Sequence, residues 1–124
     1  MITLLNQDLN TIISQMESLD HHEIILKETS RVSEFSYHLL SREEFFTGQI
    51  GYRIDLEGNP LTGMKEGEWK DNWVVIGYEE GEGDPLFIDL SNEVHPVLTT
   101  KHDHGCWKPN ILFSSFNDFI EKIS

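Results

Sequence analysis

The stretch Trp73–Leu90, WVVIGYEEGEGDPLFIDL, contains two apolar runs joined by an acidic connection rich in glycine. The first run is aromatic and β-branched, which favours a strand, and it lacks strict alternation, so both of its faces are expected to be covered. In the connection, glycine permits positive φ and Pro85 fixes its own φ, which favours a turn. The stretch therefore predicts a buried β-hairpin with a tight, acidic turn.

Further elements are predicted on both sides of this hairpin. Apolar residues recur at helical spacing over 3–19 and again from Phe116 to Ile123, where Ser114 or Ser115 can cap the helix. A serine and a glutamate three residues later form a capping box that predicts a brief helix over 41–46. Segment 20–36 fits either a helix or a strand. Short runs typical of strands lie at 23–27, 37–40, 49–56 and 95–99.

The order of these elements predicts the fold class. A helix, several short strands and a final helix, without long helical crossovers, indicate a single α+β domain over residues 1–124. We expect an antiparallel or mixed sheet of four to six strands with the N- and C-terminal helices packed on it. A chain of 124 residues, 38% of them hydrophobic, is the size of one domain.

The chain carries features of a cytoplasmic protein. Its lone cysteine, Cys106, excludes an intramolecular disulfide and suits a reducing compartment. No run approaches the roughly 18 apolar residues of a membrane span, and the N-terminus lacks the pattern of a secretion signal. We therefore expect a cytoplasmic location and no membrane partner.

Acidic residues outnumber basic ones by 22 to 9, which gives a formal net charge of −13. Segment 55–93 alone holds eleven acids and two lysines. This charge repels phosphate backbones and anionic lipids, so direct nucleic-acid binding is disfavoured. Two interpretations stay open: the acids keep the surface hydrated, or they form a patch that attracts a basic partner.

One short segment carries side chains that bind metals or act as nucleophiles. His102, His104 and Cys106 are donors that zinc accepts, but the chain has neither a second cysteine nor a recognisable zinc motif. A polar loop in which Cys106 packs inward is the favoured interpretation. The chain also lacks a nucleophile elbow, a phosphate-binding loop and a dinucleotide fingerprint. We therefore expect no enzyme activity, no metal and no cofactor.

The three tryptophans are large anchors in a small chain. Trp73 is expected in the core because it belongs to the apolar hairpin. Trp69 is surrounded by charged residues, so it fits either the core or a partly exposed binding site, where an aromatic ring beside carboxylates is a common hot spot.

Several motifs in the same order resemble the SUKH superfamily, which contains many bacterial immunity proteins and fungal regulators of cell-wall glucan synthesis. The resemblance covers residues 36–124, while the N-terminal third diverges because segment 20–36 lacks the Leu-Pro, Tyr and Asn-Gly pattern that accompanies the second helix of members. The matching residues are Gln49–Tyr52, Asp55, Trp69, Trp73–Gly77, Gly83–Asp89, Pro96, Val97, His104, Gly105, Trp107, Ser115, Phe116 and Phe119.

The resemblance implies a domain without catalytic residues that binds and neutralises a polymorphic toxin, often a nuclease. The −13 charge fits this independently, because nucleases expose basic clefts. The alternative is an interaction module in regulation or cell-wall biology, as the fungal members suggest. A more remote third possibility is a metal-dependent enzyme. Gly83, Asp84, Asp89 and Trp107 are expected to hold the fold. The expected partner-binding residues are Glu66, Glu68, Trp69, Asp71, Glu79, Glu80 and Glu82.

Overall fold

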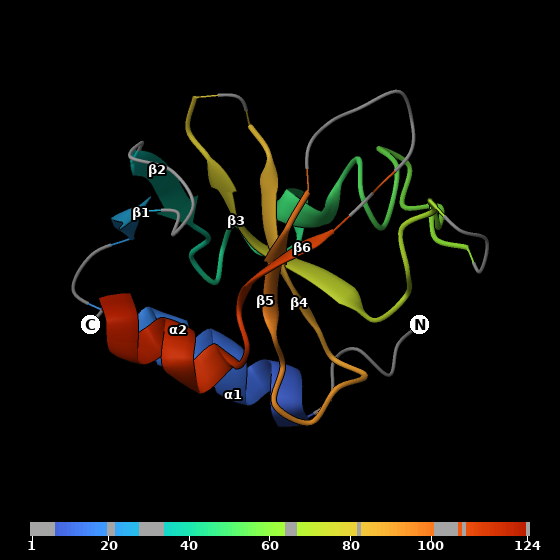
Figure 1. Ribbon diagram of the computed structural model, residues 1–124. Helices are drawn as coiled ribbons and strands as arrows, with labels where there is room; N and C mark the ends of the chain where they lie inside the picture. Colours follow the sequence, from blue (N-terminus) through green and yellow to red (C-terminus); the bar gives the residue numbers. More distant parts are fainter. Residues whose placement is uncertain are drawn as a thin grey trace.

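The predicted hairpin forms the centre of an antiparallel sheet (Figure 1). The computed structural model describes residues 7–19, 22–27, 34–63, 67–81, 83–100, 107 and 109–123. Within them, six strands follow one another in chain order, and each is antiparallel to the next. The strands are β1 Glu23–Lys27, β2 Glu34–Leu39, β3 Trp73–Glu79, β4 Pro85–Asp89, β5 Val97–Thr99 and β6 Asn110–Phe113. The single α+β domain with an antiparallel sheet is thus confirmed.

Both terminal helices pack on one face of this sheet, the inner face (Figure 1). Helix α1 runs over Gln7–Glu17 and α2 over Phe116–Ile123. Alternation in the strands directs one set of side chains to this face, and Phe119 of α2 contacts Phe113 of β6 with ring centroids 5.3 Å apart. The buried core on this side includes Leu9, Ile12, Ile13, Met16, Ile24, Tyr37, Leu39, Leu86, Ile88, Val97, Phe116 and Phe119.

The outer face of the sheet is covered over its centre by the long segment that joins β2 to β3. Trp69 from this segment lies against Phe87 of β4, with ring centroids 4.6 Å apart. Its indole Nε1 donates a hydrogen bond of 2.9 Å to the carbonyl oxygen of Trp73. Tyr52 and Trp107 complete the aromatic cluster around it. Trp69 is only 1% exposed, so the interpretation that placed it on the surface is wrong.

The Gln49 side chain bonds the backbone of β3 where no neighbouring strand of the described chain does so on that side. Strand β2 pairs only with the end of β3, from Gly77 to Glu79. Nearer the start of β3, the buried Gln49 amide bonds both backbone groups of Val75: its Oε1 accepts from the Val75 N–H at 2.9 Å, and its Nε2 donates to the Val75 carbonyl at 2.8 Å. One side chain thus satisfies two backbone groups that would otherwise be buried without partners.

The prediction of a strand over residues 49–56 is wrong. The 3-10 helix η2 (Thr47–Gln49) is followed by turns, and only isolated bridges join Ile50 to Ile54 and Ile54 to Pro60. The positive φ of 94° at Gly51 breaks the extended backbone, and Leu56 is 83% exposed rather than buried. The alternation of apolar residues here reflects a series of local turns, in which the Gly51 N–H donates to the Ile54 carbonyl.

The remaining expectations have mixed outcomes. Segment 41–46 forms turns and not an α-helix, yet the capping-box bonds are present: the Ser41 N–H donates to Glu44 Oε1 at 2.9 Å, and the Glu44 N–H to Ser41 Oγ at 3.3 Å. In segment 20–36 the structure describes residues 22–27 and 34–36, which belong to β1 and β2 except for the bend at His22, and β6 was not predicted. The Ser115 cap of α2 is confirmed, because its Oγ accepts from the Asp118 N–H at 3.1 Å.

Among the described residues, no helix has the length and apolar character to cross a membrane.

Candidate protein-binding surface

The described acids among the predicted partner-binding residues lie near the two ends of β3. Glu68 and Asp71 are exposed and precede the strand, whereas Glu79 closes it and the exposed Glu80 begins the following turn. A strand of seven residues is about 20 Å long at 3.3 Å per residue, so these acids belong to two separate groups. Glu79 is 9% exposed, which leaves Glu80 as the more accessible acid of the pair. Glu66 and Glu82 lie outside the described residues.

The β3–β4 turn is held by the residues for which the sequence predicts a structural role. Gly83 has a φ of 81°, which favours glycine, and its N–H donates to the Glu79 carbonyl at 2.8 Å. The Glu79 N–H in turn donates to the Asp84 carbonyl at 2.8 Å. The turn therefore depends on backbone bonds, and the exposed Glu80 side chain projects from a defined position.

Two further residues with a predicted structural role hold loops. Asp89 Oδ1 accepts from the Ser91 N–H at 2.9 Å, which closes the turn after β4. The Trp107 N–H donates to the Gly67 carbonyl at 2.9 Å, and its ring lies 5.5 Å from that of Tyr52. Both contacts favour a role in the fold over a role in binding.

The predicted donor cluster of His102, His104 and Cys106 lies outside the described residues. Within the part of the chain that the structure describes, no three histidine, cysteine or acidic side chains are grouped to hold a metal ion.

Among the described residues, none covers the outer face over β1, β2 and the end of β3 as the segment before β3 covers its centre. The register pairs Glu23 with His38 and His38 with Tyr78, and it pairs Ile25 with Ser36. Paired residues share a face, so these five side chains lie on the outer face, and the Glu80 N–H donates to the Ser36 carbonyl at their border. We call this area the outer patch: Glu23, Ile25, Ser36, His38, Tyr78 and Glu80.

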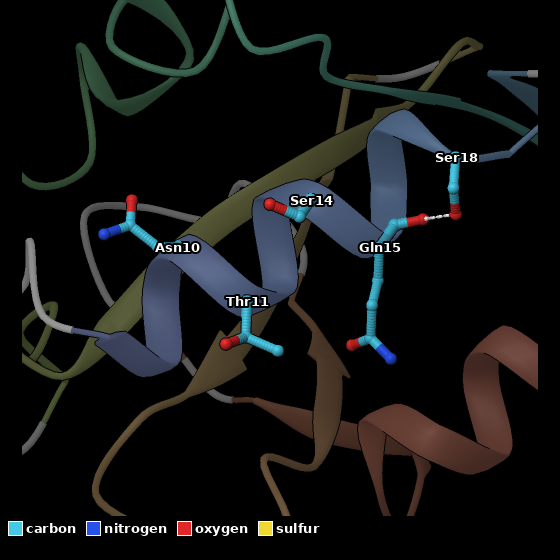
Figure 2. Close-up of a pocket in the computed structure, with 5 residues that line it drawn as sticks. All are labelled: Asn10, Thr11, Ser14, Gln15 and Ser18. Carbon is cyan, nitrogen blue, oxygen red and sulfur yellow. Dashed lines mark hydrogen bonds between the residues drawn. The ribbon is translucent and has the colours of Figure 1, made fainter.

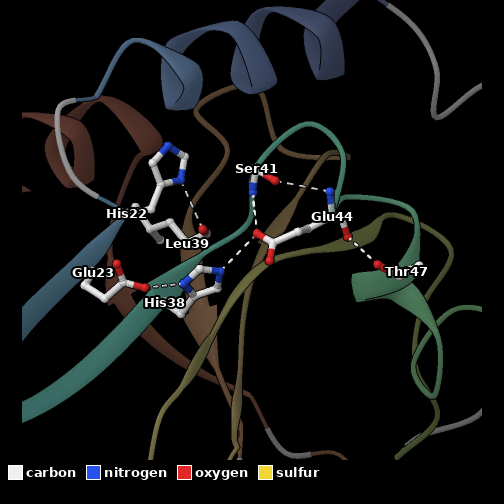
Figure 3. Close-up of polar contacts among 7 residues, drawn as sticks. All are labelled: His22, Glu23, His38, Leu39, Ser41, Glu44 and Thr47. Carbon is white, nitrogen blue, oxygen red and sulfur yellow. Dashed lines mark hydrogen bonds and ion pairs between the residues drawn. The ribbon is translucent and has the colours of Figure 1, made fainter.

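The centre of the outer patch is a histidine between two carboxylates (Figure 3). His38 Nδ1 lies 2.5 Å from Oε2 of Glu23 on β1, and its Nε2 lies 3.0 Å from Oε1 of Glu44 in the turn after β2. A neutral imidazole has one N–H and can donate to only one of them, whereas the imidazolium donates to both. Protonated His38 therefore joins β1, β2 and the following turn.

The electrostatics of this cluster agree with its geometry. Burial lowers the pKa of His38, but the hydrogen bonds to Glu23 and Glu44 outweigh it, so the pKa is raised above its usual value. The pKa of Glu44 is lowered, mainly by the hydrogen bond from the Ser41 backbone N–H and next by the hydrogen bond to His38. Both directions favour the charged pair near neutral pH.

This cluster predicts a pH-dependent stability. Because the pKa of His38 is raised in the folded state, its contribution is fully present below the unfolded pKa of about 6.5 and is lost as the pH rises through the folded pKa. Urea unfolding of the wild type and of His38→Gln at several pH values measures the contribution of His38 to the free energy of unfolding. We expect the free energy of unfolding of the wild type to exceed that of His38→Gln by more at pH ~6 than at pH ~8.5. A difference independent of pH would contradict the role of protonated His38 between Glu23 and Glu44.

A second surface feature is a shallow, open depression on the solvent side of α1 (Figure 2). Its lining is polar and uncharged, and Ser18 Oγ donates to the Gln15 carbonyl at 2.7 Å within it. None of these side chains is an acid, a base or an activated nucleophile, so the depression can form hydrogen bonds but has no catalytic group in its lining. The lining residues are Asn10, Thr11, Ser14, Gln15 and Ser18.

Comparisons with known proteins assign no family to this chain. No protein-family model, no curated protein and no solved structure matches this chain. The resemblance to the SUKH superfamily therefore stays a prediction.

Proposed function

We propose that this protein is an immunity protein of the SUKH type that binds a nuclease toxin and neutralises it through an acidic surface. The observation that carries the proposal is the formal net charge of −13, of which a large part falls in segment 55–93. A nuclease binds phosphate backbones with basic side chains, so an acidic protein competes for the same groups. Neutralisation by this route requires occupancy of the cleft and no catalytic group.

The charge acts first on the rate of association. Opposite fields raise the association rate of proteins by about 10- to 1,000-fold at low ionic strength. Glu80 and Asp84 lie on the β3–β4 turn, while Glu68 and Asp71 lie at the other end of β3. Acids at both ends of the hairpin widen the attractive field.

The fold supplies a rigid carrier for these acids. Strands β3 and β4 are buried along most of their length, and the turn between them is closed by backbone hydrogen bonds. Side chains on such a support lose little freedom on binding, which lowers the cost of forming a complex.

Co-expression tests the proposal. The toxic C-terminal domain encoded beside this gene would be produced in cells with or without the protein, and we expect survival only with it. If no neighbouring gene encodes such a domain, or if cells that contain the folded protein still die, the alternative of an interaction module in regulation or cell-wall biology is favoured.

A further inference from the structure

We propose that the outer patch is the surface on which the toxin docks, by a basic region that carries an apolar side chain next to an arginine. This inference rests on the proposed function and adds the site and the chemistry of contact. It differs from the prediction made from the sequence, which placed the contact on the β3–β4 connection and the segment before β3.

The outer patch combines exposed apolar surface with rigid backbone. Ile25 is 65% exposed and Tyr78 is 41% exposed, and both belong to strands of the central sheet rather than to loops. Their chain neighbours Ile24 and Gly77 face the core and are buried. Ser36 is paired with Ile25, and its carbonyl oxygen accepts the hydrogen bond from the Glu80 N–H at the border of the patch. An apolar side chain of a partner can pack against the exposed Ile25 and Tyr78.

The charge of the outer patch selects the partner. Glu23 is 63% exposed and Glu44, beside the patch, is 46% exposed, while Glu80 is exposed on its border. The basic side chain of the patch is His38, whose imidazolium offsets one of the three carboxylates Glu23, Glu44 and Glu80, so this surface stays negative. The nearby Arg42 is already bound by Glu17 of α1, at 2.8 Å from both its Nε and its Nη2.

Arginine fits this surface better than lysine. The Tyr78 ring lies 5.2 Å from the His38 ring and the residue is 41% exposed, so part of its surface stays accessible to a planar guanidinium. The guanidinium also has donors for Glu80 or Glu23 while it stacks. Nuclease clefts use arginine to bind phosphate, which links this contact to the neutralisation proposed above.

The position of the outer patch agrees with an interface. The inner face of the sheet is buried under α1 and α2, and the centre of the outer face is buried under Trp69 and Tyr52. The end of the sheet formed by β1, β2 and the end of β3 has no such cover within the described residues. Apolar side chains that combine with charged neighbours at an uncovered site mark protein–protein contacts.

Two matched variants test the inference. Ile25 on β1 and Ile111 on β6 are exposed isoleucines, at 65% and 66%, on the opposite edge strands of the same sheet. Ile25→Arg and Ile111→Arg change the net charge equally, so they alter long-range attraction to a similar degree and differ in the surface that they block. The probe is the toxin domain with its catalytic residue inactivated, and calorimetry measures its Kd.

We expect Ile25→Arg to weaken binding by at least about tenfold relative to Ile111→Arg, and Tyr78→Ser to weaken it by a similar factor. Thermal melting checks that the variants are folded. Equal affinities of the two arginine variants, with Tyr78→Ser unchanged, would overturn the docking site and leave the proposed function standing. Failure of the wild type to bind the toxin domain would overturn the proposed function and, with it, this inference.

Discussion

Replacement of Trp69 with alanine is expected to lower the free energy of unfolding by about 3–5 kcal/mol. The side chain is 1% exposed and contacts the rings of Tyr52, Trp73 and Phe87, so its removal leaves a large cavity between the sheet and the covering segment. The indole hydrogen bond to the Trp73 carbonyl is lost as well. Urea unfolding followed by circular dichroism measures the change.

Leu56→Ala in the same segment is the control, because Leu56 is 83% exposed and its truncation is expected to change stability by less than about 0.5 kcal/mol. A Trp69→Ala variant with the stability of the wild type, but with weaker binding to the toxin, would place this ring at the interface and contradict its burial.

Replacement of Gln49 with methionine is expected to lower the free energy of unfolding by about 2–4 kcal/mol, because buried groups left without partners cost about 1–3 kcal/mol each. Methionine has a similar size but cannot replace the bonds to the N–H and carbonyl of Val75, or the bond of 2.9 Å from Nε2 to the Phe45 carbonyl. The same urea experiment measures it.

Gln15→Met is the matched control for Gln49→Met. Gln15 lies on the open side of α1 (Figure 2), and we expect a change within about 0.5 kcal/mol. Equal effects of the two substitutions would show that the Gln49 amide does not act as a substitute for a strand.

The elements that the sequence predicted correctly are those with strong local signals. The hairpin of β3 and β4 was identifiable because two apolar runs flank a turn with glycine and proline. Helix α2 was identifiable because Phe116 and Phe119 recur at helical spacing after the capping Ser115. In these segments the local pattern and the tertiary contacts favour the same structure.

The errors arose where tertiary contacts decide the structure. Alternation over 49–56 is typical of a strand, but the Gln49 side chain, rather than the backbone of this segment, bonds β3. Trp69 has charged neighbours in sequence, yet it is buried by Phe87 and Trp107, which are distant in the chain. Sequence neighbours describe local polarity and do not reveal which distant rings a side chain contacts.

The outer patch could be predicted only in part. The strand at 23–27 and the Ser41–Glu44 capping box were both recognised, and these place Glu23 and Glu44 on defined elements. His38 had no signal of its own, since its role depends on the pairing of β1 with β2. A register that joins residues 15 positions apart is not contained in local composition.

The affinity of the protein for the inactivated toxin domain at two ionic strengths tests the central claim of charge-driven binding most directly. The Debye length falls from about 30 Å at ~10 mM to about 8 Å at ~150 mM, so long-range attraction is largely screened at the higher value. For a chain of net charge −13, we expect Kd to increase at least tenfold between these conditions, mainly through a slower association rate. Equal Kd values at both ionic strengths would contradict the account.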